Sequence, residues 1–454
     1  MKNMIKYLVI LACLLPCKSV AEETQRELTL SLEECVEIAL ERSTRVVSGK
    51  LQRDLSDAAV DQARASFLPT LSANYDNSNG INGPRNASFI DQATGSLVQS
   101  VGESTTSGAQ GVGASMGISL FNASNIANLA GAKKDYQAAR YDFEAGKDQV
   151  EFEARRDYFA LLQSMSLLEV QREQVRVSEE SLRRAETLNE IGSSPISDVF
   201  SSKADLEGHR AQLILRENDV EINRSNLAFT LGMTADVSII PKQVEIRIDP
   251  VPLTFEKAYE IAADRPGLEA DRYGMLGAKE SLRATQFRLR FPTLSMSASY
   301  SWSLSDDEEF NGVEDLFLSN YRYNVRIAVS VPVFNMGTTM TAKRQKIQYL
   351  QQMETYEQAK RQLGLQVRRT MLELTQLRRS IDANEAAVVA QEQDFRLQDE
   401  AYNFGAGTFL NRQQAQLRLF TARSNLVRAR YNYQIQLATL EQLIGMPIAE
   451  AAAK

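Results

Sequence analysis

Long stretches of the chain place apolar residues every three to four positions, which is typical of amphipathic helices. The two longest stretches also carry apolar residues at intervals of seven, as in the series Val367, Leu374, Ile381 and Val388. A sustained heptad indicates helices that supercoil against neighbours. The pattern predicts six helices, over 32–66, 122–190, 196–230, 255–289, 335–403 and 409–443. At 1.5 Å per residue, each of the two longest would extend roughly 100 Å.

Four shorter segments alternate apolar and polar residues instead. The clearest is 294–303, where leucine, methionine, alanine, tyrosine and tryptophan alternate with serine. Similar runs cover 111–120 and 323–331, and a weaker one covers 71–75. A serine and glycine face opposite an apolar face fits a strand between water and lipid, and about ten residues span a bilayer at a tilt. A soluble, half-buried sheet is the alternative.

The two halves of the chain repeat one another. Residues 30–39 reappear at 253–262, and Gly192 reappears as Gly405. Each copy contains a helix, two strands, a long helix, a short break and a final helix. We therefore divide the chain into a first repeat (22–232), a linker (233–252), a second repeat (253–446) and a C-terminal tail (447–454).

Four strands are too few to stand in lipid, because open edges would leave backbone groups unpaired. Closure needs at least two copies of the chain, and three copies give twelve strands. The loops between paired strands, 77–108 and 304–320, have surface character, and the second contains the acidic run 306–309. We expect them to face outside the cell.

The N-terminus has the features of a secretory signal peptide over residues 1–21. Lys2 and Lys6 precede an apolar run over 7–15, and Ser19-Val20-Ala21 supplies small residues for cleavage before Glu22. A lipoprotein signal ending at Cys17 is the alternative, which Pro16 disfavours. No later run is long and apolar enough for a spanning helix. Cys35 then stands alone in the mature chain, and we expect it to be a small buried hydrophobe.

Charge and composition exclude several classes of function. The net charge of −7 and pI near 5.3 argue against a nucleic-acid partner. His209 is the sole histidine, which excludes a typical zinc site and a histidine-dependent triad. Neither a Walker-type loop nor a dinucleotide-binding glycine motif appears. We therefore predict no enzymatic activity, no cofactor and no metal site.

Several short motifs, in order and duplicated, resemble the TolC family of outer-membrane channels over nearly the whole mature chain. They are Leu30-Ser31-Leu32-Glu33-Glu34, Ile38-Ala39-Leu40, Phe67-Leu68-Pro69-Thr70-Leu71, Asp264-Arg265-Pro266-Gly267-Leu268, Phe291-Pro292-Thr293-Leu294, Tyr402-Asn403-Phe404-Gly405 and Ala429-Arg430-Tyr431-Asn432-Tyr433. The resemblance implies a mostly helical homotrimer with a twelve-stranded β-barrel in outer-membrane lipid. A tunnel of twelve helices would extend into the periplasm of a Gram-negative cell.

The resemblance also implies partners and site residues. Family members receive substrates from an inner-membrane transporter through a periplasmic adaptor, in efflux or type I secretion. The adaptor-docking turns correspond here to Gly192, Ser193, Pro195, Gly405 and Gly407. The periplasmic constriction corresponds to Asp198, Asn411 and Gln414. Well-known members carry acidic residues at the second turn, so the amides Asn411 and Gln414 are a departure.

Two other functions compete with an export channel. A coiled-coil periplasmic spacer or adaptor would explain the helices but would not account for the serine-faced strands. A surface adhesin would use the loops to bind a ligand. The sequence does not distinguish drugs, proteins and metals as substrates. For Asp198, Asn411 and Gln414, simple capping or solvation of the first turns of helices 196–230 and 409–443 remains an alternative to a role in the constriction.

Overall fold

A computed structural model describes residues 27–90, 93, 95–234, 237–244, 246, 248–305 and 314–453. The signal peptide predicted over 1–21 and the acidic run 306–309 lie outside these residues. The chain forms two compact units. We call them the hairpin unit (27–48, 145–265 and 362–453) and the strand unit (49–144 and 266–361).

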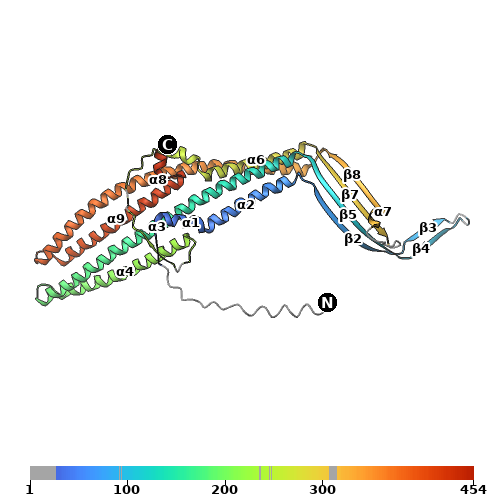
Figure 1. The fold of residues 1–454 in the computed structure, drawn as a ribbon. Coiled ribbons are helices and arrows are strands. Elements are labelled where there is room, and N and C mark those ends of the chain that lie inside the picture. Colours follow the sequence, from blue (N-terminus) through green and yellow to red (C-terminus); the bar gives the residue numbers. More distant parts are fainter. Residues whose placement is uncertain are drawn as a thin grey trace. The chain divides into compact units, whose positions relative to one another are not determined.

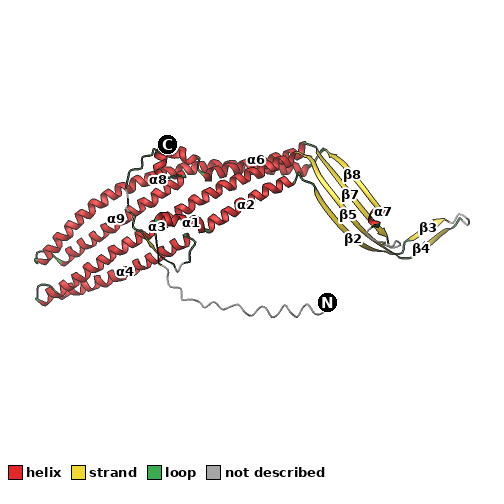
Figure 2. Cartoon of the chain, in the orientation of Figure 1, coloured by secondary structure: helices red, strands yellow, loops and turns green. Residues whose placement is uncertain are grey.

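The helices of the structure follow the predicted repeat (Figures 1 and 2). The two longest have 68 residues each: α3 (Ala123–Glu190) and α8 (Met336–Asn403). The other long helices are α4 (Ile196–Thr230) and α9 (Phe409–Ile444), and the chain ends in α10 (Ile448–Ala453). These bounds confirm four of the six predicted helices to within a residue. None of the described helices contains a stretch long and apolar enough to cross a membrane.

The other two predicted helices were wrong as continuous elements. Residues 32–66 form α1 (Leu32–Arg42) and α2 (Thr44–Ala65), and 255–289 form α5 (Phe255–Ala263) and α6 (Pro266–Arg290). Pro266 disfavours a helical conformation in the residue before it, so α5 ends first. Ser43 is extended, with ψ 128°, and its hydroxyl accepts a hydrogen bond from the Arg45 amide.

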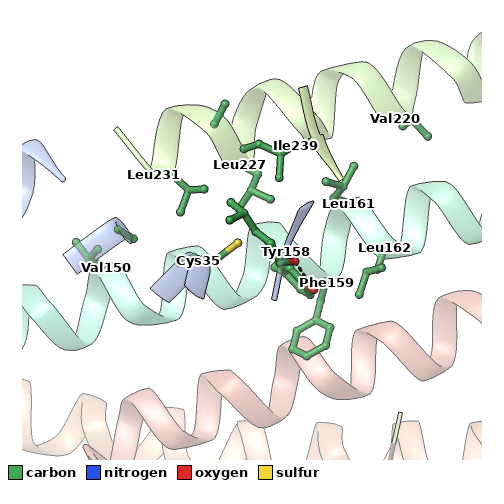
Figure 3. Packing of buried hydrophobic residues seen from close by; sticks show 14 of the residues in the cluster. Cys35, Val150, Tyr158, Phe159, Leu161, Leu162, Val220, Leu227, Leu231 and Ile239 are labelled. Carbon is green, nitrogen blue, oxygen red and sulfur yellow. Dashed lines mark hydrogen bonds between the residues drawn. The ribbon is translucent and has the colours of Figure 1, made fainter. Parts of the chain in front are cut away.

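The main core of the hairpin unit surrounds Tyr158, on α3 (Figure 3). Cys35 and Ile239 are both completely buried there, which confirms the prediction for Cys35. Burial raises the pKa of the Cys35 thiol to about 12, so the thiol stays protonated. The Tyr158 hydroxyl donates to the Lys242 carbonyl at 2.7 Å. This bond anchors the linker, which contains strand β6 (Ser238–Pro241). β6 pairs in parallel with β1 (Glu27–Leu30), a pairing that the sequence did not predict.

A four-stranded antiparallel sheet dominates the strand unit, in the order β2-β5-β7-β8 (Figure 1). Its strands are β2 (Thr70–Asn82), β5 (Thr105–Asn122), β7 (Thr293–Ser305) and β8 (Tyr321–Ser330). Residues directly opposite one another share a face of a sheet. The pairing aligns Ala298 with Met116 and Val325, and Ser299 with Ser115 and Asn324. One face is therefore apolar and the other polar, as the alternation predicts.

The apolar face is open to solvent in the single chain. Val325, Ile327 and Val329 on β8 are 70%, 66% and 66% exposed, and Leu71 on β2 is 80% exposed. A continuous apolar face of this kind marks a surface that is covered in the working protein.

The segment predicted as a long loop, 77–108, is largely strand. β2 continues to Asn82, β5 begins at Thr105, and a hairpin of β3 (Asn86–Ile90) and β4 (Leu97–Val101) lies between them. The asparagine, serine and glycine of this segment are poor strand formers and mask the pairing. The second predicted loop holds a short helix, α7 (Asp315–Leu318).

Candidate functional site

Each helical hairpin of the hairpin unit turns at one of the predicted glycines. Gly192 follows α3 with φ +74°, and Gly405 follows α8 with φ +71°. In the first turn the Gly192 amide donates to the Asn189 carbonyl, and the Ser193 amide donates to the Leu188 carbonyl. This pair of bonds is the Schellman motif, which favours glycine in the left-handed position.

The second turn repeats these bonds. The Gly405 amide donates to the Tyr402 carbonyl at 3.1 Å, and the Ala406 amide donates to the Ala401 carbonyl at 2.9 Å. An added Cβ on Gly192 or Gly405 would meet no atom within 4 Å. Glycine is therefore favoured at both positions for its backbone conformation, and the space around it is open.

The helices after the turns begin at equivalent residues. Pro195 caps α4 without a side-chain bond, whereas the Thr408 hydroxyl caps α9 by accepting from the Asn411 amide at 3.2 Å. Asp198 occupies the third position of α4, as Asn411 does in α9. The Asp198 carboxylate accepts from the Ser194 hydroxyl at 2.8 Å, and a negative charge is favourable at this end of a helix.

A groove of about 670 Å³ lies between the two turns. Five predicted site residues line it, and they come from both halves of the chain: Ser193, Pro195, Asp198, Gly405 and Gly407. Apolar side chains around the turns are strongly exposed, including Ile191 at 68% and Phe404 at 86%. The Tyr402 hydroxyl in the groove is buried and has no hydrogen-bond partner among the described residues.

A buried arginine links the two hairpins just behind the groove. Arg412 on α9 is 3% exposed and contacts Asp399 on α8 at 2.6 Å and the Ser181 hydroxyl on α3 at 2.7 Å. Arg184 on α3 also contacts Asp399, at 2.9 Å. Burial alone would raise the pKa of Asp399, but hydrogen bonds from Arg412 and Arg184 outweigh it and lower that pKa.

Gln414, one turn after Asn411 on α9, lies on the wall of a second, polar cavity of about 320 Å³. His209 and Asp205 on α4 line the same cavity. Burial lowers the pKa of His209, so the imidazole is neutral at neutral pH, and burial raises the pKa of Asp205. Gln413 donates a hydrogen bond to Asp205, which joins α9 to α4. Among the described residues, no three histidine, cysteine or acidic side chains gather in a metal-binding group.

Sequence reasoning missed the link formed by Arg184, Asp399 and Arg412. A signal was present in the repeat, because the spacing that relates Gly192 to Gly405 also relates Val199 to Arg412. The second copy has the charged Arg412 where the first has the apolar Val199, which indicates that Arg412 makes a contact absent from the other hairpin. The repeat does not indicate that Asp399 is the residue it contacts.

Comparison with known proteins gives one family. The profile of the outer membrane efflux protein family matches residues 35–233 and 259–446. The outer membrane protein TolC of Vibrio cholerae is 22% identical over 419 residues, which cover 91% of this chain and 90% of that protein.

Solved structures with the same fold cover almost the entire chain. The CusC channel superposes with a TM-score of 0.77 at 17% identity, over 91% of this chain and 92% of that one. The outer membrane protein VceC of Vibrio cholerae gives 0.76 at 17% identity, over 92% and 96%. These likenesses establish the fold of long helical hairpins and four antiparallel strands.

Proposed function

Because the chain belongs to the outer membrane efflux protein family, we propose that three copies assemble into one exit duct of a transport system that spans both membranes. Members of this family are channels, and this chain is an outer-membrane efflux channel that extends into the periplasm. The proposal concerns how the copies assemble, which partner they contact and where the duct closes.

The exposed apolar face of the four-stranded sheet carries the proposal. Its valine, isoleucine and leucine side chains suit contact with lipid, and the opposite face of serine and glycine suits water. Strands β2 and β8 form the two edges of the sheet, and each has one unpaired side among the described strands. Unpaired backbone groups in lipid cost several kcal/mol each. Pairing β8 of one copy with β2 of the next removes both edges, and three copies give a twelve-stranded barrel.

The groove between the helical turns is the proposed docking site for a periplasmic adaptor. Ser193, Pro195, Gly405 and Gly407 line it with little side-chain bulk, and Gly192 shapes the turn beside it. The exposed Ile191 and Phe404 offer apolar contacts. Such a groove fits the tip of a helical hairpin that carries apolar side chains. The adaptor would in turn join the duct to an inner-membrane transporter.

The residues that follow the turns form the proposed constriction. In three copies, Asp198, Asn411 and Gln414 would each form a ring near the periplasmic entrance. Amide rings carry no net charge, so Asp198 supplies the only carboxylate ring among these three. The expected constriction therefore attracts cations more weakly than one with several acidic rings.

Planar-bilayer recording of the purified protein tests this function. We expect discrete channels from the native chain. The double substitution Asn411→Asp and Gln414→Glu should raise cation selectivity and strengthen block by multivalent cations, because carboxylates focus negative potential at a narrow point. A preparation without channels would contradict the proposed function. Unchanged selectivity and block in the double variant would show that Asn411 and Gln414 do not line the constriction.

A further inference from the structure

The four-stranded sheet β2-β5-β7-β8 carries three charged residues in all, and the pairing places them on the same face. Asp76 lies on β2, and Arg322 and Arg326 lie on β8. Asp76 pairs with Gly111, Arg322 with Ser301, and Arg326 with Ser297, so all three belong to the serine and glycine face. The apolar face of these strands carries no charge.

The two arginines have no ion-pair partner among the described residues. The residues across the sheet from Arg322 are Ser301, Gly113 and Asn74, and those across from Arg326 are Ser297, Gly117 and Thr70. These side chains are short and uncharged, so the guanidinium groups are the largest groups on this face. Asp76 is three strand spacings from β8, about 14 Å, and cannot pair with the arginines of its own copy.

This arrangement gives the polar face a net charge of +1 per copy. In the proposed barrel, β2 of a neighbouring copy would lie beside β8, and its Asp76 could neutralise at most one of the two arginines. Within the strands, at least one arginine per copy would then have no acidic partner, on a face otherwise lined by small uncharged side chains. Rings of arginine in a pore favour anions.

We propose that Arg322 and Arg326 form a positively charged region inside the strand section of the duct and favour the passage of anionic solutes. The inference rests on the proposed function, because only the closed barrel turns this face into a pore wall. It concerns a different part of the duct from Asp198, Asn411 and Gln414. The constriction would act at the periplasmic entrance, and the arginines would act at the level of the membrane.

The test is the reversal potential of the purified protein in a planar bilayer under a potassium chloride gradient. The double substitution Arg322→Gln and Arg326→Gln should lower the permeability of chloride relative to potassium by roughly twofold or more. Arg322→Lys with Arg326→Lys keeps both charges and should retain the native ratio. Asp76→Asn removes the one opposing charge and should raise the ratio.

The outcomes separate this inference from the function on which it rests. Native protein without channels would overturn both. Native channels with an unchanged ratio in the glutamine variant would overturn the inference alone. So would an equal loss of chloride permeability in the glutamine and lysine variants, because it would show that side-chain shape and not charge is responsible.

Discussion

Replacing Gly405 with leucine should abolish export while the protein still assembles in the outer membrane. Gly405 has φ +71°, and an added Cβ meets no atom within 4 Å. The substitution therefore costs only about 1–2 kcal/mol of backbone strain, which is too little to unfold the helices. The leucine side chain would instead project at the rim of the groove, where the proposed adaptor docks. The measurement is export by cells that carry the chain's own transport partners, with the amount of assembled protein in the outer membrane.

Two further variants sharpen this test. Gly405→Asn should keep most of the export, because asparagine tolerates the left-handed conformation. Gly208→Leu places the same side chain on an exposed position of α4 that also has open space, far along the helix from the turn, and should export normally. If Gly405→Leu exports like the native chain, the turn is not part of the docking surface. The same series can be built at Gly192, which has the same geometry.

Replacing Arg412 with methionine should loosen the contact between the two helical hairpins. Arg412 is nearly buried and its removal leaves Asp399 with Arg184 as its remaining ion-pair partner. Removing one partner of a buried pair is costly, but Asp399 is 24% exposed and stays paired. We therefore expect a loss of about 1–3 kcal/mol of local stability, or roughly 5- to 150-fold faster amide exchange near the turns.

The matched control is Arg418→Met, on the same helix. Arg418 contacts Asp394 at 2.7 Å, but its side chain is 49% exposed. An exposed ion pair contributes at most about 1 kcal/mol, so exchange near the turns should change little. Equal effects of the two substitutions would show that the burial of Arg412 is not responsible.

Acid should act on the same contact. The pKa of Asp399 is lower in the folded chain than its ordinary value, so the stabilisation is present above that ordinary value, about pH 4. It is lost as the pH falls through the lowered pKa. The protection of amides near the turns of the native chain, measured relative to the intrinsic exchange rate, should therefore fall at low pH. In the Arg412→Met variant, the same fall in pH should reduce the protection of these amides by less.

The sequence predicted the parts of the fold that periodicity controls. Heptads and the internal repeat located α3, α4, α8 and α9, and alternation located the strands and their two faces. Both turns were found because glycine interrupts the helices at equivalent points. Ser43 and Pro266 break two predicted helices, although Pro266 was visible in the sequence as a residue that ends the preceding helix.

The patterns of apolar and polar residues did not predict contacts between segments that are distant in the sequence. The pairing of β1 with β6 joins residues that are more than two hundred positions apart, and each strand has only four residues. Arg412, Asp399 and Arg184 lie on three helices, and nothing in their spacing along the chain indicates that they meet. The polar cavity lined by Gln414 likewise depends on how α3, α4 and α9 pack.

The number of copies in the purified, detergent-solubilised protein is the most direct test of the proposed duct. The open edges of β2 and β8 and the exposed apolar face require partners, and three copies supply twelve strands. Light scattering, corrected for bound detergent, should give a protein mass three times that of one chain. A uniform population of single chains in mild detergent, with the four-stranded sheet intact, would contradict the assembly.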